Sequence, residues 1–375
     1  MAIEDMINST VPSNMTGVED VDSAAVRACK VLAYCLIILM SLIGNSLVIT
    51  VIYKDKRMKT NINRFIVNMC ISDILMTLWV LPQTISSIVH DGRWQVTGDM
   101  GDFLCKMVPL WQDVSAGVSI FSMTVIAFDR FFAIVLPFKA HVITTRRCYL
   151  MIFLTWFLSV IIHTPYLFTL RLYQFDEDNI QCRQIWPIDL MEKNIPTIFY
   201  LLQFSMLYAV PLLSIAFFYT AVILELNRKS KTENQNITQQ RARQRENREV
   251  SFMLITVVVL FALSWAPLNT MAFLHFFKWE KEGVSPSYGR TLRFVADFLI
   301  HSNSAQNAVI YFTFNSRFKQ GLRKICCCPS GRDHQDNDIS NGYSSMRSKR
   351  WYIKRDCDTN VDRVELTSRT GNGVI

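Results

Sequence analysis

The chain has 375 residues, of which 50% are hydrophobic and only 19% are charged. This composition excludes an ordinary soluble protein, whose surface would need more charge, and favours a membrane protein. The net charge of +8 gives no separate support for nucleic-acid binding, because the basic residues gather beside the hydrophobic segments.

The hydrophobic residues form blocks about as long as the ~20 residues that an α-helix needs to cross a bilayer. In chain order the predicted spans are 29–53, 64–90, 103–136, 148–170, 195–226, 250–277 and 290–314. The sequence therefore predicts an all-α membrane protein, a seven-transmembrane helix bundle spanning 29–314. Residues 1–28 form a predicted extracellular tail, 315–328 an amphipathic helix with a cysteine triplet, and 329–375 a disordered cytoplasmic tail.

Lys and Arg in short loops beside a membrane span tend to stay on the cytoplasmic side, and this predicts the orientation of the chain in the membrane. They are dense after the first, third and fifth spans and at the start of the tail, for example at Lys56, Arg146 and Arg245. The N-terminus is then extracellular, the C-terminus is cytoplasmic, and the expected location is the plasma membrane. Two sequons in the N-terminal tail predict glycosylation at Asn8 and Asn14.

Cysteines stand out on both sides of the membrane. Cys105 lies at the outer end of the third span and Cys182 lies in the loop after the fourth, so a disulfide between them would hold that loop over the bundle. The alternative is two free extracellular thiols, which an oxidising compartment disfavours. Beneath the last span, an amphipathic segment is followed by three palmitoylation candidates that could instead remain reduced thiols: Cys326, Cys327 and Cys328.

Polar side chains inside a span are costly unless they are paired, so each of them suggests a functional site. Several lie at a similar depth in the first, second, third and seventh spans: Asn45, Asp73, Ser119, Asn303, Ser304 and Asn307. Their oxygen and amide groups suit a small hard cation such as Na⁺. A network of hydrogen bonds that joins the helices is an equally good interpretation of the spacing alone.

Two further patterns suggest movement. Asp129 and Arg130, at the inner end of the third span, could pair in one state and separate in another, or could be a simple interfacial pair. Prolines that can kink a helix lie within four spans, at Pro82, Pro165, Pro211 and Pro267, although proline is also simply tolerated in membrane helices.

These motifs together resemble the rhodopsin-like family of G-protein-coupled receptors. The resemblance runs from the first span to the cysteine triplet, and the motifs that carry it occur in the family's order and spacing: Gly44-Asn45, Asn68 to Asp73, Trp94, Cys105, Asp129-Arg130-Phe131, Trp156, Pro211 with Tyr219, Ser264-Trp265-Ala266-Pro267 and Asn307-Ala308-Val309-Ile310-Tyr311. The sequence departs from the family pattern at Phe131, at Ser264 and, most seriously, at Ala308, where the family has a proline.

The resemblance implies specific roles. Asp73, Ser119, Asn303, Ser304 and Asn307 match the family's allosteric sodium site, while no other cofactor is expected. The residues that match its activation switch are Asp129, Arg130, Ile120, Pro211, Tyr219, Phe261 and Tyr311. An extracellular ligand would favour an outward position of the sixth helix and open a site for a heterotrimeric G protein. Arrestin, a receptor kinase and membrane lipids are further partners that the resemblance implies.

The expected ligand is a peptide. Gln112 occupies the position where amine receptors of this family carry an aspartate, and it resembles the glutamine that faces an amidated peptide terminus in neuropeptide Y and RFamide-type receptors. Asp113 would point about 100° away from it on a helix. Acidic residues at Asp91, in the loop 176–178 and at Asp297 would favour a basic ligand, unless they are only solvated loop residues. The expected pocket comprises Gln112, Trp111, Gln203, Trp265, Asn269, His275, Asp297 and His301.

Competing functions fit the sequence less well. An amine or lipid receptor of the same family remains an alternative, whereas light sensing would need a lysine where the seventh span has His301. A transporter would be expected to show internal repeats, and none is evident. No arrangement of residues suggests an enzyme.

Overall fold

The structure is a computed structural model that describes residues 22–139, 143–176, 179–192, 194–232, 238–279 and 289–327. Several predictions concern residues outside these ranges: the glycosylation sites Asn8 and Asn14, Cys328 and the tail 329–375.

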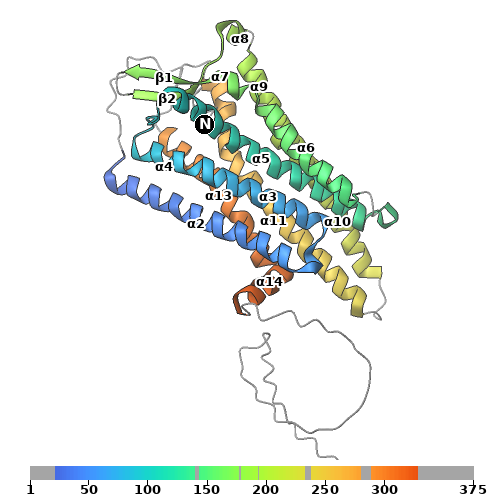
Figure 1. Cartoon of the computed structure of the whole chain (residues 1–375). Coiled ribbons are helices and arrows are strands. Elements are labelled where there is room, and N and C mark those ends of the chain that lie inside the picture. The colour runs from blue at the N-terminus through green and yellow to red at the C-terminus, as the bar shows by residue number, and fades with distance from the viewer. Residues whose placement is uncertain are drawn as a thin grey trace, which may run out of the picture.

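A bundle of helices makes up the described chain (Figure 1). Its long segments are α2 (Ala24–Lys54), α3 (Asn61–Trp79) with α4 (Leu81–Val89), α5 (Gly98–Ile134), α6 (Thr145–His163) with α7 (Tyr166–Thr169), α9 (Ile195–Phe204) with the π-helical turn η3 (Ser205–Ala209) and α10 (Val210–Thr232), α11 (Thr238–Leu274) with η4 (His275–Trp279), and α13 (Gly289–Phe314). Shorter elements are η1 (Lys56–Met58), η2 (Pro137–Lys139), β1 (Leu170–Asp176), β2 (Asn179–Gln184), α8 (Ile188–Glu192) and α14 (Ser316–Cys327).

Among the described residues, six of these segments are long and apolar enough to cross a membrane. The seventh segment, α13, is more polar and packs against α2, α3 and α11. His301, Ser304 and Asn307 on this helix are all buried. The seven-helix bundle predicted from the sequence is therefore confirmed, and the polar side chains of α13 face its neighbours.

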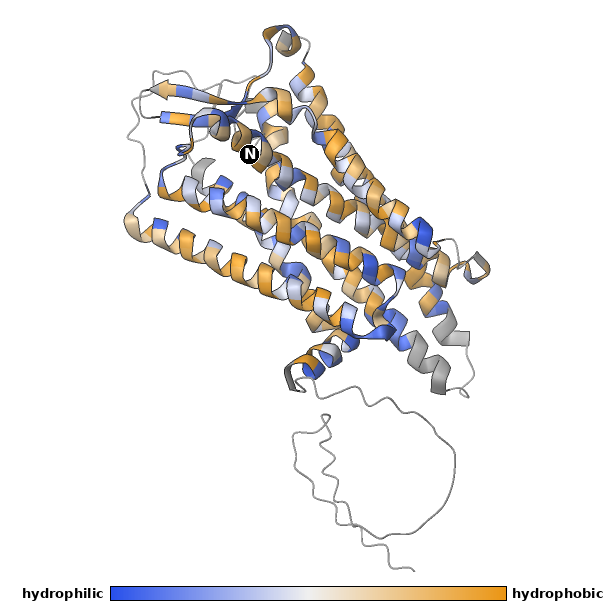
Figure 2. Cartoon of the chain, in the orientation of Figure 1, coloured by the Kyte–Doolittle hydropathy of each residue, from blue (hydrophilic) through white to orange (hydrophobic). Residues whose placement is uncertain are grey.

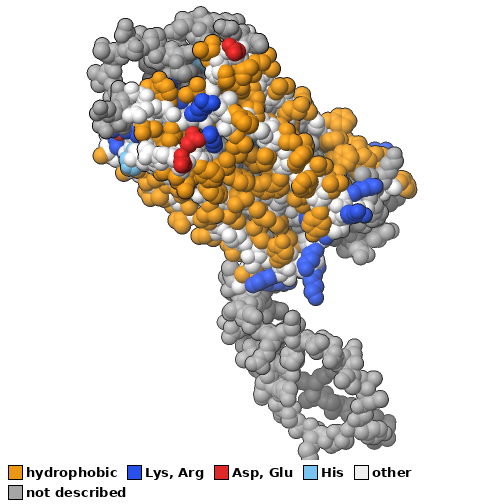
Figure 3. Space-filling model, turned by 45° about the horizontal axis from the view of Figure 1, so that its top comes forward, with side chains coloured by type: hydrophobic (Ala, Val, Ile, Leu, Met, Phe, Trp, Pro, Cys, Tyr) orange, Lys and Arg blue, Asp and Glu red, His pale blue; other side chains and the backbone are white. Residues whose placement is uncertain are grey.

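Hydrophobic residues predominate along the helices (Figure 2), and hydrophobic side chains cover most of the face of the bundle seen in Figure 3, as expected for contact with lipid. On α2, Leu32 and Ile43 are 62% and 57% exposed, whereas Tyr34 and Asn45 on the opposite face are buried. Because water cannot satisfy polar groups in hydrocarbon, this pattern places the polar side chains of the spans between helices.

Prolines interrupt two of the predicted spans. The second span is divided at Val80, and Pro82 lies in the first turn of α4. The fourth span ends at His163, and Pro165 caps the short helix α7. Proline lacks an amide donor and its ring clashes with the preceding turn, which explains why the regular helix is interrupted at both places. By contrast, α11 continues through Pro267, and α5 continues through Pro109, which the sequence analysis did not single out.

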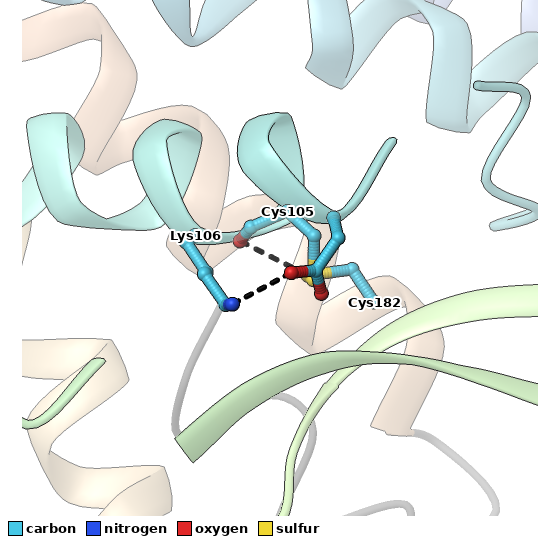
Figure 4. Close-up of a disulfide and its surroundings, with 4 residues drawn as sticks. Cys105, Lys106 and Cys182 are labelled. Carbon is cyan, nitrogen blue, oxygen red and sulfur yellow. Dashed lines mark hydrogen bonds and ion pairs between the residues drawn. A yellow bond between two sulfur atoms is a disulfide. The ribbon is translucent and has the colours of Figure 1, made fainter. Parts of the chain in front are cut away.

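A β-hairpin lies across one end of the bundle. Strands β1 and β2 are antiparallel, with Leu172 opposite Cys182, and the amide of Trp94 donates to the carbonyl of Ile180 at 2.7 Å. The predicted disulfide between Cys105 and Cys182 is present and ties β2 to α5 (Figure 4). The sequence analysis predicted this tether but not the strands.

The short helix α14 lies at the opposite end of the bundle (Figure 1). Phe318 is fully buried against Tyr311, with their ring centroids 5.9 Å apart. A Cβ atom added to Gly321 would lie 2.4 Å from Val51 Cγ1, so only glycine allows α14 to approach α2 this closely. The predicted amphipathic eighth helix is thus present, and its backbone includes Cys326 and Cys327.

Candidate functional site

A narrow cavity of ≈ 70 Å³ opens between the helices below the hairpin. It is lined by Gln112, Asp113, Ala116, His163, Tyr166, Tyr200, Gln203, Phe204, Leu207, Tyr208, Phe261, Trp265, Leu268 and Asn269. Drug-sized ligand pockets measure about 300–1,000 Å³. This cavity would therefore hold only a small part of a ligand unless the helices moved apart.

Four of the eight residues expected in the ligand pocket line this cavity, namely Gln112, Gln203, Trp265 and Asn269. The other four lie elsewhere. Trp111 packs edge-on against Trp156, with their ring centroids 6.3 Å apart. His275 is buried at the start of η4, and Asp297 lies 4.0 Å from Arg293 on the same helix.

His301, the last of these four, does not line the cavity but holds Gln112 in place. Its Nε2 lies 3.2 Å from Gln112 Oε1, and its Nδ1 lies 3.0 Å from the hydroxyl of Tyr34. An amide oxygen only accepts, so Nε2 donates to Gln112 and Nδ1 accepts from Tyr34. Within the part of the chain that the structure describes, the amide nitrogen of Gln112 has no hydrogen-bond partner, and the residue lines the cavity.

Asp113 also lines the cavity, although the sequence analysis placed it on a different face from Gln112. The cavity extends around α5, so two adjacent residues whose directions differ by about 100° both reach it. Tyr166 donates to Asp113 Oδ2 at 2.7 Å, and Gln203 Nε2 donates to the Tyr166 hydroxyl at 3.2 Å. This polar chain joins three segments, α5, α7 and α9.

The hairpin and the break at Pro165 hold Tyr166 in position. Tyr166 begins α7, where the chain leaves the fourth span, and its side chain is 2% exposed. It packs in one cluster with Trp94, Leu170 and the Cys105–Cys182 disulfide. Local sequence and tertiary contacts therefore both fix its hydroxyl beside Asp113.

Below the cavity lie the residues expected to form the activation switch. Phe261 stacks on Trp265, with ring centroids 5.9 Å apart, so the cavity floor is in direct contact with the core. Ile120, Phe261, Tyr219 and Tyr311 belong to one buried cluster, and Pro211 is buried at the start of α10. A side chain pushed into the cavity would therefore disturb the buried cluster that extends toward the inner end of the bundle.

Of the residues expected to bind sodium, Asp73, Ser304 and Asn307 form hydrogen bonds between α2, α3 and α13. Asn307 Nδ2 donates to Asp73 Oδ2 at 3.1 Å, and Asn45 Nδ2 donates to the carbonyl of Ser304 at 2.9 Å. Ser119 and Ser304 are buried. Asn45 Oδ1 and Asn303 Nδ2 are also buried and have no partner among the described residues. The Asp73 carboxylate and the unpaired Asn45 oxygen are groups that suit a hard cation, whereas the Asn303 amide nitrogen is a donor and would need an acceptor such as bound water.

Charged side chains form contacts at the inner end of the bundle, both within and between helices. Arg130 pairs with Asp129 at 2.7 Å within α5. Between helices, Arg317 of α14 pairs with Glu246 of α11 at 2.5 Å, and the Ser316 hydroxyl donates to Glu249 at 2.6 Å. The sequence analysis missed this link between α11 and α14, because Glu246 and Glu249 lie among many charged residues of one polar segment.

Ala308, the main departure from the family pattern, lies where α13 approaches α2. The helix continues through this residue from Gly289 to Phe314. A Cβ atom added to Gly44 would lie only 2.7 Å from Ala308 Cβ. Two small residues therefore allow the first and seventh helices to pack closely.

Comparison with known proteins agrees with this architecture. Residues 44–311 match the family described as 7 transmembrane receptor (rhodopsin family). The chain is 28% identical to the QRFP-like peptide receptor of Branchiostoma floridae over 318 residues, which cover 83% of this chain and 80% of that protein. It is 31% identical to neuropeptide Y receptor type 2 of Homo sapiens over 329 residues (86% and 82%), and 29% identical to neuropeptide FF receptor 2 of Rattus norvegicus over 316 residues (80% and 72%). The chain therefore belongs to the rhodopsin family of seven-transmembrane receptors.

Proposed function

We propose that this receptor binds an extracellular neuropeptide and activates a heterotrimeric G protein at the plasma membrane. The observation that carries the proposal is the cavity, where Gln112 offers an amide donor among aromatic walls. A carboxamide or carboxylate at a peptide terminus would accept from this donor. The printed names of the three relatives, all of them peptide receptors, support the same ligand class.

The small volume of the cavity is consistent with a peptide that inserts only its end. The hairpin lies above the cavity and is fixed to α5 by the disulfide. The rest of a bound peptide would extend along this rigid edge, where extended backbone can form hydrogen bonds with exposed strand groups. An amine or lipid ligand is the second candidate, because a carboxylate and many aromatic rings also line the cavity.

Activation would be a shift between two populations of the bundle. A ligand that presses on Trp265 and Phe261 would displace α11, since both residues lie on that helix. Outward movement of α11 would expose Arg130, Tyr219 and Tyr311 to the G protein. A sodium ion held by Asp73, Ser119, Asn303, Ser304 and Asn307 would stabilise the inactive bundle by neutralising a buried carboxylate.

The remaining features follow from the proposed orientation, with the hairpin outside and α14 inside. Glycosylation at Asn8 and Asn14 would then be extracellular, and palmitoylation at Cys326, Cys327 and Cys328 would anchor α14 to the inner leaflet. Arrestin and a receptor kinase are the expected cytoplasmic partners.

The test is a calcium assay in cells that express the chain with a promiscuous G protein and receive pooled amidated neuropeptides. We expect a saturable response that is strongly right-shifted in Gln112→Ala and unchanged in Gln95→Ala, a matched variant of an exposed glutamine in the loop before α5. Silence of well-expressed surface receptor toward all peptides, with a response to amines or lipids, would contradict the peptide assignment. Substrate flux without nucleotide exchange would contradict the receptor itself.

A further inference from the structure

Asp113 is an acidic side chain without a cationic partner in the wall of the cavity. Its only hydrogen bond to a described residue comes from Tyr166, and this bond occupies Oδ2. No described Lys or Arg forms an ion pair with it. A carboxylate in a membrane span is costly unless a positive charge or several donors compensate it. The cavity therefore contains an acidic group whose counter-ion is missing from the described protein.

The described neighbours of Asp113 hold its carboxylate in position but do not form an ion pair with it. Tyr166 is fixed by the disulfide cluster, and its hydroxyl is held from the other side by Gln203. His163 also lines the cavity and uses its Nδ1 on the carbonyl of Ser159 at 2.7 Å. No described side chain donates a hydrogen bond to Asp113 Oδ1, so this oxygen remains available to a group inside the cavity.

We infer that Asp113 forms, with Tyr166 and Gln203, a cation subsite that binds a basic side chain of the peptide ligand while Gln112 binds the peptide's terminal carboxamide. This inference rests on the proposed function. Gln112 and Asp113 are adjacent on α5 and point to different sides of the cavity, so the two ligand groups they bind belong to different positions of the peptide. A guanidinium fits best, since it can donate to the carboxylate and to the Tyr166 oxygen together.

The subsite makes a specific distinction among ligands. A peptide with arginine near its amidated end should be preferred over the same peptide with citrulline, which has nearly the same shape but no charge. Losing one partner of a desolvated charge pair reduces affinity by about 30-fold or more. The preference should disappear when the receptor carboxylate is removed, because both changes break the same pair.

The experiment uses two pools of amidated peptides that differ only in arginine or citrulline, applied to the full-length receptor in the calcium assay. The variants are Asp113→Asn, Asp113→Glu and, as a matched control, Asp102→Asn on the outer turn of the same helix. Asp102 pairs with Lys106 at 2.6 Å and lies outside the cavity lining (Figure 4 shows this ion pair beside the disulfide). Asparagine can still accept from Tyr166, and surface labelling identifies any variant that fails to fold.

The inference is supported if the wild type and Asp102→Asn prefer the arginine pool by about 30-fold, if Asp113→Asn shows no preference, and if Asp113→Glu keeps part of it. It is overturned, while the peptide assignment stands, if the wild type responds equally to both pools or if Asp113→Asn keeps the preference. A response to monoamines that depends on Asp113, without any peptide response, would mean that the cation is a free amine and would overturn both proposals. Silence toward every ligand would remove the proposed function and the inference with it.

Discussion

The link between α11 and α14 is expected to hold the sixth helix inward in the resting receptor. Glu246 pairs with Arg317, and Glu249 accepts from Ser316. Both contacts join α11 to the start of α14 and would break if α11 moved outward. Glu246→Ala combined with Glu249→Ala removes both acceptors and should therefore raise signalling in the absence of ligand.

The size of this effect follows from the exposure of the contacts. The Arg317 and Glu246 side chains are 45% and 40% exposed, so their pair contributes about 0.2–1 kcal/mol. The hydrogen bond from Ser316 contributes about 1 kcal/mol. Together, about 1–2 kcal/mol would change the ratio of active to inactive receptor by about 5- to 30-fold. A receptor that is about 1% active at rest would become roughly 5–20% active.

The assay is ligand-independent second-messenger production, normalised to surface receptor. The matched control is Glu225→Ala, which breaks the ion pair with Arg228 at 2.9 Å within α10 and leaves both contacts between α11 and α14 in place. The charge-swapped variant Glu246→Arg with Arg317→Glu should return basal signalling toward the wild-type level. Unchanged basal output in the double alanine variant, or equal activation by the control, would refute the proposed role of the link.

Four further outcomes test other parts of the structure. Gly44→Val should lower the melting temperature of the purified receptor by overpacking against Ala308, at a cost of about 1–3 kcal/mol, and an unchanged melting temperature would contradict the close approach. Ala308→Pro should alter basal signalling, because proline disrupts the continuous α13; identical basal and agonist-driven output would count against this. Asp73→Asn should abolish any effect of sodium on agonist affinity, and a retained sodium effect would place the ion elsewhere. His301→Phe should weaken peptide potency about as much as Gln112→Ala if His301 acts by orienting that amide, whereas full potency would show that Gln112 needs no such support.

Hydrophobic blocks predicted the helices well, because bilayer thickness sets their length. The same blocks could not show where a span is divided. Pro82 lies inside the second hydrophobic block, yet the helix breaks at Val80. Proline is tolerated in many membrane helices, and whether it kinks or divides one depends on the packing around it. The hairpin was missed for a related reason, since a short loop strand between Leu170 and Asp176 carries no strong periodicity.

Residue positions within the cavity were harder to predict than the helices themselves. Gln112 and Gln203 were expected there, whereas Asp113 was set aside because it faces another direction on α5. Helical geometry gives the angle between neighbouring side chains, but the width of a cavity around the helix depends on partners far away in sequence. Tyr166 lies just after the fourth span and donates a hydrogen bond to Asp113. Apart from the preceding Pro165, nothing in the sequence around Tyr166 indicates that it belongs to the cavity.

The π-helical turn Ser205–Ala209 divides the fifth span into an outer and an inner half. A turn of this kind accommodates one extra residue, so the outer half is rotated by about 100° relative to an uninterrupted α-helix. Gln203 lies above the turn and Tyr219 lies below it. The direction of each side chain around the helix axis therefore depends on the extra residue in the turn. The number of residues between them matters as much as their identity: a chimaera joined on either side of 205–209 must conserve that count, or the ligand-facing and G-protein-facing surfaces of the span will no longer match.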